Sequence, residues 1–257
     1  MSLIQMSFFS QTLNRIADVN IILPLPRHVQ ASFEDVPVLY LLHGMGDDYT
    51  AWLRKTNIER YALEAGLAVI MPDGGLSCYE NMAHGECFRD YMRCELPSVM
   101  RSCFPISTKR EKTFIAGCSM GGHGALKTAL AQPEIYSAVG CFSASLLEYR
   151  PDVQSNRLML ERVYGDALSE ADARNIAAAK HVAAGDMPLR VWHSCGDDDM
   201  LLECAGSTRD FFEKLQGNAI DYHFELLRGR HDWRQWDAAV ERFIGFLHLP
   251  ETDRQLM

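Results

Sequence analysis

The sequence lacks the features that mark several large classes of protein. It has no block of basic residues, and its net charge is −9 over 257 residues, which argues against nucleic acid or an anionic membrane surface as the partner. No apolar run approaches the roughly 18 residues that span a bilayer. We therefore expect a protein that binds neither nucleic acid nor membrane and takes a small neutral or cationic molecule instead.

Secretion and metal binding also find no support in the residue pattern. The first residues, 1–13, carry no cationic start, no signal core and no small-residue cleavage site. The eight cysteines form no C-x-x-C pair, and no histidine stands near them at metal-ligand spacing. We expect free thiols, no metal site and a cytoplasmic, reducing location.

The order of apolar and amphipathic segments predicts an α/β fold in a single domain, residues 1–257. Hydrophobic residues make up 47% of the chain and charged residues 23%, as in ordinary globular proteins. From about residue 36, short apolar runs alternate with amphipathic segments, which indicates a mostly parallel sheet flanked by helices. The expected strands are 36–42, 67–71, 113–116, 138–142, 189–193 and 221–227, and the expected helices are 49–66, 90–104, 122–131, 203–216 and 233–247.

Two segments depart from this alternation. Residues 7–23 read as an antiparallel pair of strands added to one edge of the sheet. Residues 146–186 are polar and helix-forming, and they interrupt the alternation between two apolar strands. We expect this second segment to form a small helical cap or insert over the site.

The sequence Gly117-Cys118-Ser119-Met120-Gly121 is a G-x-S-x-G motif between an apolar strand and a helix-forming run. A bare motif of this kind arises often by chance, but the strand before it and the helix after it indicate the sharp turn that exposes a nucleophilic serine. We therefore predict Ser119 as the nucleophile. The backbone N–H of Met120, at the start of the helix, should donate to an oxyanion.

A second oxyanion donor should come from the loop after the 36–42 strand. That loop reads His43-Gly44-Met45-Gly46, and its glycines let the backbone turn toward the nucleophile. Met45 N–H is the predicted donor, with Gly46 as the alternative. His43 precedes the serine in the chain, so we interpret it as a residue that orders the loop.

The acid and the base should follow Ser119 in that order, as they do in the α/β-hydrolase fold. After the 189–193 strand comes Asp197-Asp198-Asp199, and only one of three adjacent carboxylates can be buried and charged at tolerable cost. The sequence pattern alone leaves the choice open among them. His231 follows the last strand and is the predicted base, whereas His123 is interpreted as a packing residue and His223 as a surface or satisfied core histidine.

Three motifs together resemble the tributyrin-esterase branch of the esterase D family. They are LLHGMGDDYTAW (41–52), TKREKTFIAGCSMGGHGAL (108–126) and RHDWRQW (230–236). In that family the acid stands third after a glycine and is followed by apolar residues, which selects Asp199 after Gly196. The resemblance also implies oxyanion donation by the N–H groups of Met45 and Met120, and hydrolysis without a cofactor.

The expected function is hydrolysis of short acyl esters, acetyl to butyryl, by a serine carboxylesterase that forms an acyl-enzyme. Trp52, Tyr79 and Trp233 stand close to motif residues and could line the acyl or alcohol site, although isolated aromatics more often belong to a core. Two alternatives stay open: a thioesterase of the S-formylglutathione hydrolase type, and a catalytically inactive hydrolase that serves as a binding module. The sequence leaves a homo-oligomer open as well.

Overall fold

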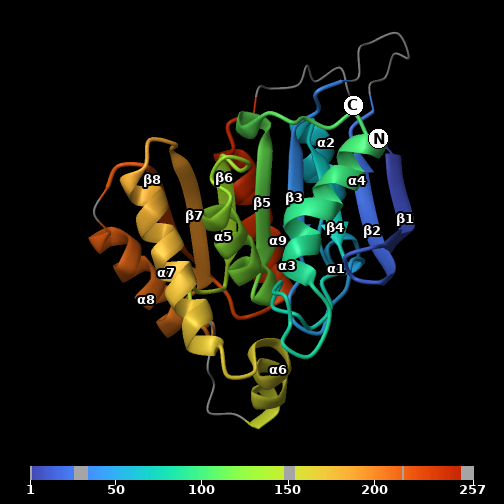
Figure 1. Cartoon of the computed structure of the whole chain (residues 1–257). Coiled ribbons are helices and arrows are strands. Elements are labelled where there is room, and N and C mark those ends of the chain that lie inside the picture. The colour runs from blue at the N-terminus through green and yellow to red at the C-terminus, as the bar shows by residue number, and fades with distance from the viewer. Residues whose placement is uncertain (1, 26–33, 148–153, 216, 250–257) are drawn as a thin grey trace.

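The computed structural model describes residues 2–25, 34–147, 154–215 and 217–249, and its eight strands form one sheet (Figure 1). The order across the sheet is β1-β2-β4-β3-β5-β6-β7-β8. The strands are β1 (Ser2–Ser10), β2 (Arg15–Leu23), β3 (Val38–Leu42), β4 (Ala68–Pro72), β5 (Thr113–Cys118), β6 (Ala138–Phe142), β7 (Leu189–Gly196) and β8 (Ile220–Leu227). Strand β2 pairs antiparallel with both β1 and β4, and the other pairs are parallel. The mostly parallel sheet and the antiparallel pair at its edge are thus confirmed.

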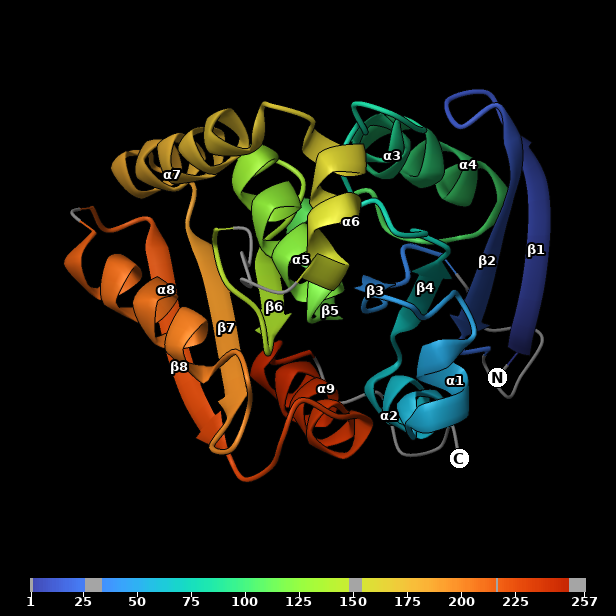
Figure 2. The ribbon, with the colours of Figure 1, turned by 90° about the horizontal axis from the view of Figure 1, so that it is seen from below.

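Helices cover both faces of the sheet (Figure 2). One face carries α1 (Ala51–Lys55), α2 (Ile58–Ala65) and α9 (Trp233–Phe246), whose buried side chains share one hydrophobic core with the sheet. The opposite face carries α3 (Phe88–Asp90), the π-helical η1 (Tyr91–Glu95), α4 (Leu96–Cys103), α5 (Met120–Ala131), α7 (Leu168–Ala184) and α8 (Leu202–Lys214). A short 3-10 turn, η2 (Arg110–Lys112), leads into β5.

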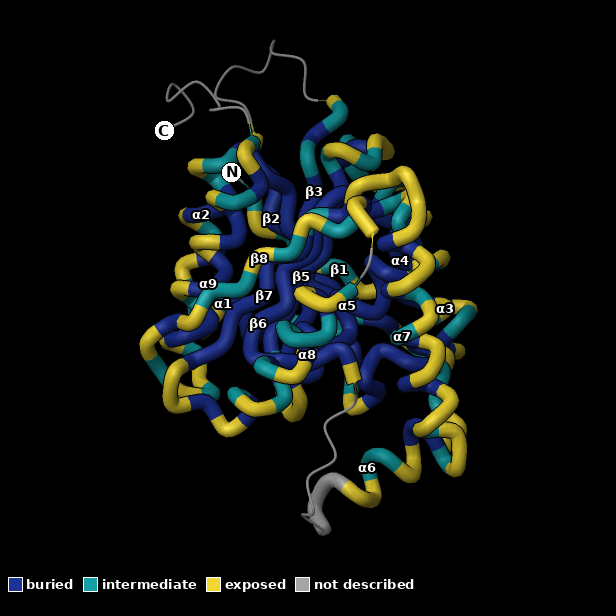
Figure 3. Tube along the Cα trace, turned by 90° about the vertical axis from the view of Figure 1, so that its left-hand side faces the viewer, coloured by how far each residue is buried: buried dark blue, intermediate teal, exposed yellow. Residues whose placement is uncertain are grey.

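The central strands are buried on both faces, which is why their sequences are continuous apolar runs. In β3, Val38, Tyr40 and Leu42 belong to the core under α5, whereas Leu39 and Leu41 belong to the core under α9. Each such side chain contributes about 1.5–3 kcal/mol when it is fully removed from water. Figure 3 shows the buried strands at the centre of the molecule. They give the site at their ends a rigid base.

Two predicted helices are divided in the structure. The 49–66 helix is broken between α1 and α2, where the backbone of Thr56 is extended. At the break, Asn57 donates from its backbone N–H and its side-chain amide to Asp237 of α9, at 2.9 and 3.1 Å. The 90–104 helix begins at Phe88 and contains the π-helical turn η1 before α4.

The predicted insert, 146–186, contains two helices with different places in the fold; its residues 148–153 lie outside the described part of the chain. Helix α7 packs beside α5 and is the crossover between β6 and β7 (Figure 2). Helix α6 (Gln154–Tyr164) projects beyond the ends of the strands (Figure 1). The carbonyl of Val163 in α6 accepts from the N–H of Ala83 at 2.7 Å. Within this segment, α6 is therefore the part that caps the sheet.

A buried histidine of β7 supports the loop that follows β6. His193 Nε2 lies 3.0 Å from the carbonyl oxygen of Ala144, and its Nδ1 lies 2.6 Å from the Tyr222 hydroxyl. Because a carbonyl only accepts, Nε2 carries the proton and the tyrosine donates to Nδ1. Burial lowers the pKa of His193 to about 4, since the charged ring would lose its hydration. His193 is neutral at physiological pH.

This depressed pKa predicts an acid-dependent loss of stability. An unfolded histidine has a pKa of about 6.5, so between about pH 6.5 and pH 4 the unfolded chain binds a proton that folded His193 does not. The contribution is complete above about pH 6.5 and is lost, at about 1.4 kcal/mol per pH unit, as pH falls toward 4. Urea unfolding of the wild type and His193→Gln should show a stability difference that shrinks by about 2 kcal/mol between about pH 7 and pH 5. A difference independent of pH would contradict this assignment.

Candidate active site

The three predicted members of a catalytic triad lie in loops at one edge of the sheet. Ser119 directly follows β5, Asp199 follows β7, and His231 follows β8. Because these strands are parallel, their carboxyl ends meet at the same edge. The fold therefore brings together three residues that are up to 112 positions apart in the chain.

Ser119 sits on a strained turn that only small neighbours permit. Its φ is 52° and its ψ is −121°, a conformation that residues with a side chain rarely adopt. Its N–H donates to the carbonyl of Phe142 at 2.8 Å. A Cβ on Gly121 would lie 2.4 Å from the backbone oxygen of Leu42, and one on Gly117 would lie 2.5 Å from the backbone of Gly121. Glycine is therefore required on both sides of the serine.

His231 bridges the nucleophile and the acid. Its Nε2 lies 2.9 Å from Ser119 Oγ, and its Nδ1 lies 2.9 Å from Asp199 Oδ1. When the carboxylate is ionised it can only accept, so Nδ1 carries the proton and Nε2 is free to accept from the serine hydroxyl. This is the tautomer that a general base needs.

Asp199 is held as a buried carboxylate. Its side chain is 0% exposed, and burial by itself raises its pKa, but the hydrogen bonds from His231 and from the Leu201 N–H lead the interactions that outweigh burial and lower the pKa overall. The Leu201 N–H donates to Oδ1 at 2.8 Å. The carboxylate therefore stays charged at neutral pH and favours the protonated imidazole that forms during proton transfer.

The two neighbouring aspartates make different contacts. Asp197 Oδ1 accepts from the Gly229 N–H at 2.9 Å. Asp198 is exposed and pairs with Arg230 Nε at 2.6 Å. Asp197 and Asp198 therefore stabilise the turn before His231. Of the three aspartates, only Asp199 contacts the imidazole.

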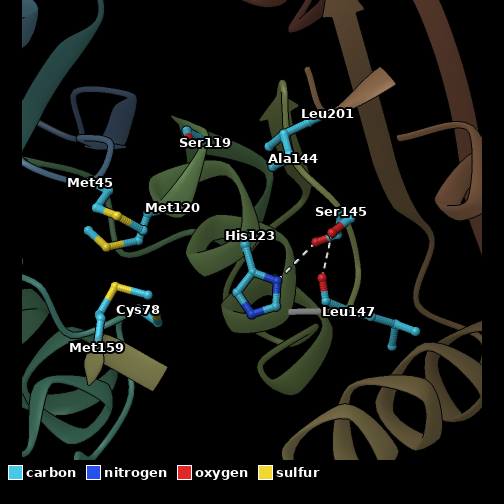
Figure 4. A pocket seen from close by; sticks show the side chains of 10 residues that line it. All are labelled: Met45, Cys78, Ser119, Met120, His123, Ala144, Ser145, Leu147, Met159 and Leu201. Carbon is cyan, nitrogen blue, oxygen red and sulfur yellow. Dashed lines mark hydrogen bonds between the residues drawn. The ribbon is translucent and has the colours of Figure 1, made fainter. Parts of the chain in front are cut away.

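The predicted oxyanion donors border Ser119. Met120 is the first residue of α5, so its N–H is one of those for which a helix offers no internal acceptor. The loop that carries Met45 abuts the nucleophile, because a Cβ on Gly44 would lie 3.6 Å from Ser119 Cβ. The side chains of Met45 and Met120 both line the pocket at Ser119 (Figure 4).

His43 orders this loop, as predicted. Its buried Nε2 accepts from the Gly74 N–H at 2.8 Å, so Nδ1 carries the proton and donates to the Gly44 carbonyl at 2.8 Å. In a trans peptide, that carbonyl and the N–H of Met45 point in opposite directions. His43 thereby fixes the direction of the Met45 N–H. The Tyr79 hydroxyl adds a second restraint by donating to the His43 carbonyl at 3.0 Å.

A small pocket of about 60 Å³ opens beside Ser119 (Figure 4). Its lining is mostly apolar and includes residues that sequence analysis did not single out. The lining residues are Met45, Cys78, Ser119, Met120, His123, Ala144, Ser145, Leu147, Met159 and Leu201. Met159 comes from α6, so this helix of the 146–186 segment reaches the pocket.

His123 belongs to the pocket wall and also holds it in place. Its Nδ1 lies 2.9 Å from the Ser145 carbonyl, so the ring supports the loop after β6. The sequence pattern predicts a packing role for His123, and the structure adds a place in the pocket wall. Its position four residues after Ser119, one helical turn along α5, was the sequence signal for a place beside the nucleophile.

The three aromatics that were candidates for substrate binding lie outside this lining. Trp52 is buried, and its Nε1 donates to the Leu42 carbonyl at 3.0 Å. Tyr79 is fully buried and holds the His43 carbonyl. Trp233 is half-buried and packs edge-on against Trp52. These contacts indicate that the three aromatics stabilise the segments around the site.

Among the described residues, no group of three or more His, Cys, Asp or Glu side chains is placed to hold a metal ion. None of the described helices combines the length and apolarity that a bilayer crossing needs. None of the eight cysteines, all of which lie in the described ranges, forms a disulfide, and Cys78, Cys118, Cys141 and Cys195 are buried.

Known proteins match nearly the whole chain. The family model "Esterase", described as "Putative esterase", matches residues 10–246. An acetyl esterase from Caldicellulosiruptor saccharolyticus is 30% identical over 259 residues, which cover 93% of this chain and 96% of that protein.

Two solved structures from Staphylococcus aureus share the fold. The fluorophosphonate-binding serine hydrolase FphF, with substrate bound, superposes with a TM-score of 0.87 and 31% identity, over 96% of this chain and 98% of that one. The S-formylglutathione hydrolase FrmB, as apoenzyme, gives a TM-score of 0.80 and 30% identity over the same shares. With the family match and this fold, the chain belongs to the esterase family and is a hydrolase of the α/β-hydrolase fold.

Proposed function

We propose that this protein is a serine carboxylesterase that hydrolyses short-chain acyl esters, acetyl to butyryl, as in the tributyrin-esterase branch of its family. The observation that carries the proposal is a pair of hydrogen bonds of 2.9 Å each. One joins Ser119 Oγ to His231 Nε2, and the other joins His231 Nδ1 to Asp199 Oδ1. The match to an acetyl esterase supports the same class of substrate.

The mechanism follows from this geometry. Ser119 Oγ attacks the acyl carbonyl while His231 Nε2 takes its proton, and Asp199 stabilises the imidazolium. The N–H groups of Met45 and Met120 donate to the developing oxyanion. His231 then protonates the leaving alcohol, and an acyl-enzyme remains on Ser119. Water activated by His231 releases the acid, so the kinetics are ping-pong.

A thioesterase would use the same residues, and the match to an S-formylglutathione hydrolase keeps this candidate in view. A comparison of kcat/KM for S-formylglutathione with that for p-nitrophenyl acetate and acetylated xylo-oligosaccharides separates the two activities. An inactive binding module is opposed by the intact contacts of His231 with both partners.

Removal of the nucleophile tests the proposal directly. We expect Ser119→Ala to lower kcat for a short p-nitrophenyl ester by about 10⁴ to 10⁶ with the fold retained, and to abolish covalent labelling by a fluorophosphonate. Ser102→Ala, a change at an exposed helical serine, is the matched control and should keep both the esterase activity and the fluorophosphonate labelling. Activity of Ser119→Ala within tenfold of wild type would refute the role, and failure of the wild type to label would favour an inactive module.

The choice of acid is tested by three single substitutions. Asp199→Asn should lower kcat by about 10³ to 10⁴, because an amide at this position favours the wrong imidazole tautomer. Asp198→Asn should have little effect on kcat, since the Asp198 carboxylate is exposed and its described side-chain contact is with Arg230. Asp197→Asn should lose far less than Asp199→Asn. The largest loss at Asp198 would overturn the assignment.

The size of the pocket supports a short acyl group. Each buried methylene contributes about 0.8 kcal/mol only where space exists to receive it, and the pocket at Ser119 holds about 60 Å³. An adjacent cavity of about 260 Å³ shares Ser145 and Leu147 with it. Whether a longer acyl chain can pass from the pocket at Ser119 into the adjacent cavity therefore depends on the wall formed by Ser145 and Leu147.

We expect kcat/KM along the p-nitrophenyl ester series to be highest at C2 to C4 and to fall by about tenfold or more at C8, a loss of roughly 1.4 kcal/mol in transition-state binding. Leu147→Ala should reduce the fall, because it shortens a side chain of the shared wall. A kcat/KM that keeps rising through C8 in the wild type would instead indicate a lipase-like enzyme with a long acyl channel.

A further inference from the structure

A second cavity, of about 130 Å³, lies on the face of the sheet that carries α5, away from the triad. Residues of α5, α7, η1 and the 79–89 segment line it, and Figure 2 shows α5 between α7 and the helices α3 and α4. None of the described residues that line it also lines the pocket at Ser119. This cavity is therefore separate from the site already described.

The cavity is strongly cationic in a chain of net charge −9. One carboxylate, Glu80, stands among the described lining residues, together with four cations: Arg89, Arg93, Lys127 and Arg174. Arg89 Nε also lies 3.8 Å from the exposed carboxylate of Asp90, outside the lining. Even when Asp90 is counted, positive charges exceed negative ones by two.

Glu80 contacts three of these four cations, and its single negative charge neutralises only one of them. Its carboxylate lies 2.9 Å from Lys127 Nζ, 3.3 Å from Arg89 Nη1 and 3.7 Å from Arg174 Nη2. Burial alone raises the pKa of Glu80, but the nearby Lys127, Arg89 and Arg174 lower it overall, so the group is ionised at neutral pH. Lys127 and Glu80 are 6% and 4% exposed.

The donors also exceed the acceptors. Three guanidinium groups and one ammonium carry about 18 N–H donors, whereas one carboxylate offers about four acceptor positions. Arg93 uses one donor on the Ala131 carbonyl, at 3.3 Å. The planar guanidinium fork matches the two oxygens of a carboxylate or phosphate group, and such charge-assisted pairs are stronger than neutral ones.

We propose that this cavity binds a small oxyanion, a phosphate or carboxylate group that is either free or the end of a larger molecule. The anion would accept from Arg89, Arg93 and Arg174 at the mouth of the cavity, and the buried ammonium of Lys127 would supply charge from below. The site is distinct from the ester site, and its existence does not depend on the proposed esterase activity.

Thermal unfolding at constant ionic strength tests this, with inorganic phosphate and succinate as separate probes and chloride as the balancing salt. An anion that binds the folded chain raises Tm in a saturable way. We expect such a rise with at least one probe. Arg174→Gln should raise the apparent Kd at least tenfold, whereas Arg60→Gln, at an exposed arginine of α2, should leave it unchanged.

A second variant should change the apparent Kd in the opposite direction. Glu80→Gln removes the one lining carboxylate, so the positive excess grows and the anion can replace the lost counter-charge of Lys127. Its apparent Kd for the same probe should fall severalfold. No saturable rise of Tm with either probe in the wild type, or equal affinity in wild type and Arg174→Gln, would overturn the proposal, and so would weaker binding by folded Glu80→Gln.

Discussion

The active site depends on how closely the turn at Ser119 approaches strand β3. The backbone of Gly121 lies so near the Leu42 oxygen that a Cβ would come within 2.4 Å of it. This contact holds Ser119 at a positive φ, starts α5 directly after it, and sets the serine against the loop that continues from β3. The nucleophile and the segments that carry both proposed oxyanion donors therefore meet at one contact between backbones, and His43 and Tyr79 hold the Met45 loop beside it.

The parts of the site that sequence analysis predicted are those that local patterns determine. Ser119 and His231 could be found because each occupies a strand-to-helix junction, and the chain order of the triad follows from the parallel sheet. The choice among three adjacent aspartates needed the family resemblance, since the three side chains are chemically identical and only the fold gives them different burial and contacts. In the structure, the side chain of Asp199 is 0% exposed and that of Asp198 is 68% exposed.

The rest depends on contacts between distant segments. The break between α1 and α2 is held by Asp237, 180 positions from Asn57, and no window of local sequence contains that partner. Likewise, Cys78 and Met159 reach the pocket from separate segments, a loop and the projecting helix α6. Trp52 and Tyr79 stand close to the motifs in sequence, but tertiary packing places them behind the site.

The pocket at Ser119 is unusually rich in sulfur, because Met45, Met120, Met159 and Cys78 all line it. Thioethers are flexible and polarizable, so such a wall adapts its shape to different apolar groups. Sulfur is also open to oxidation where it is exposed, and Met45 is 41% exposed. A methionine sulfoxide there would set a polar, chiral group beside the nucleophile. Oxidation of Met45 would therefore change the shape of this pocket, although neither the hydroxyl nor the imidazole of the triad is itself redox-active.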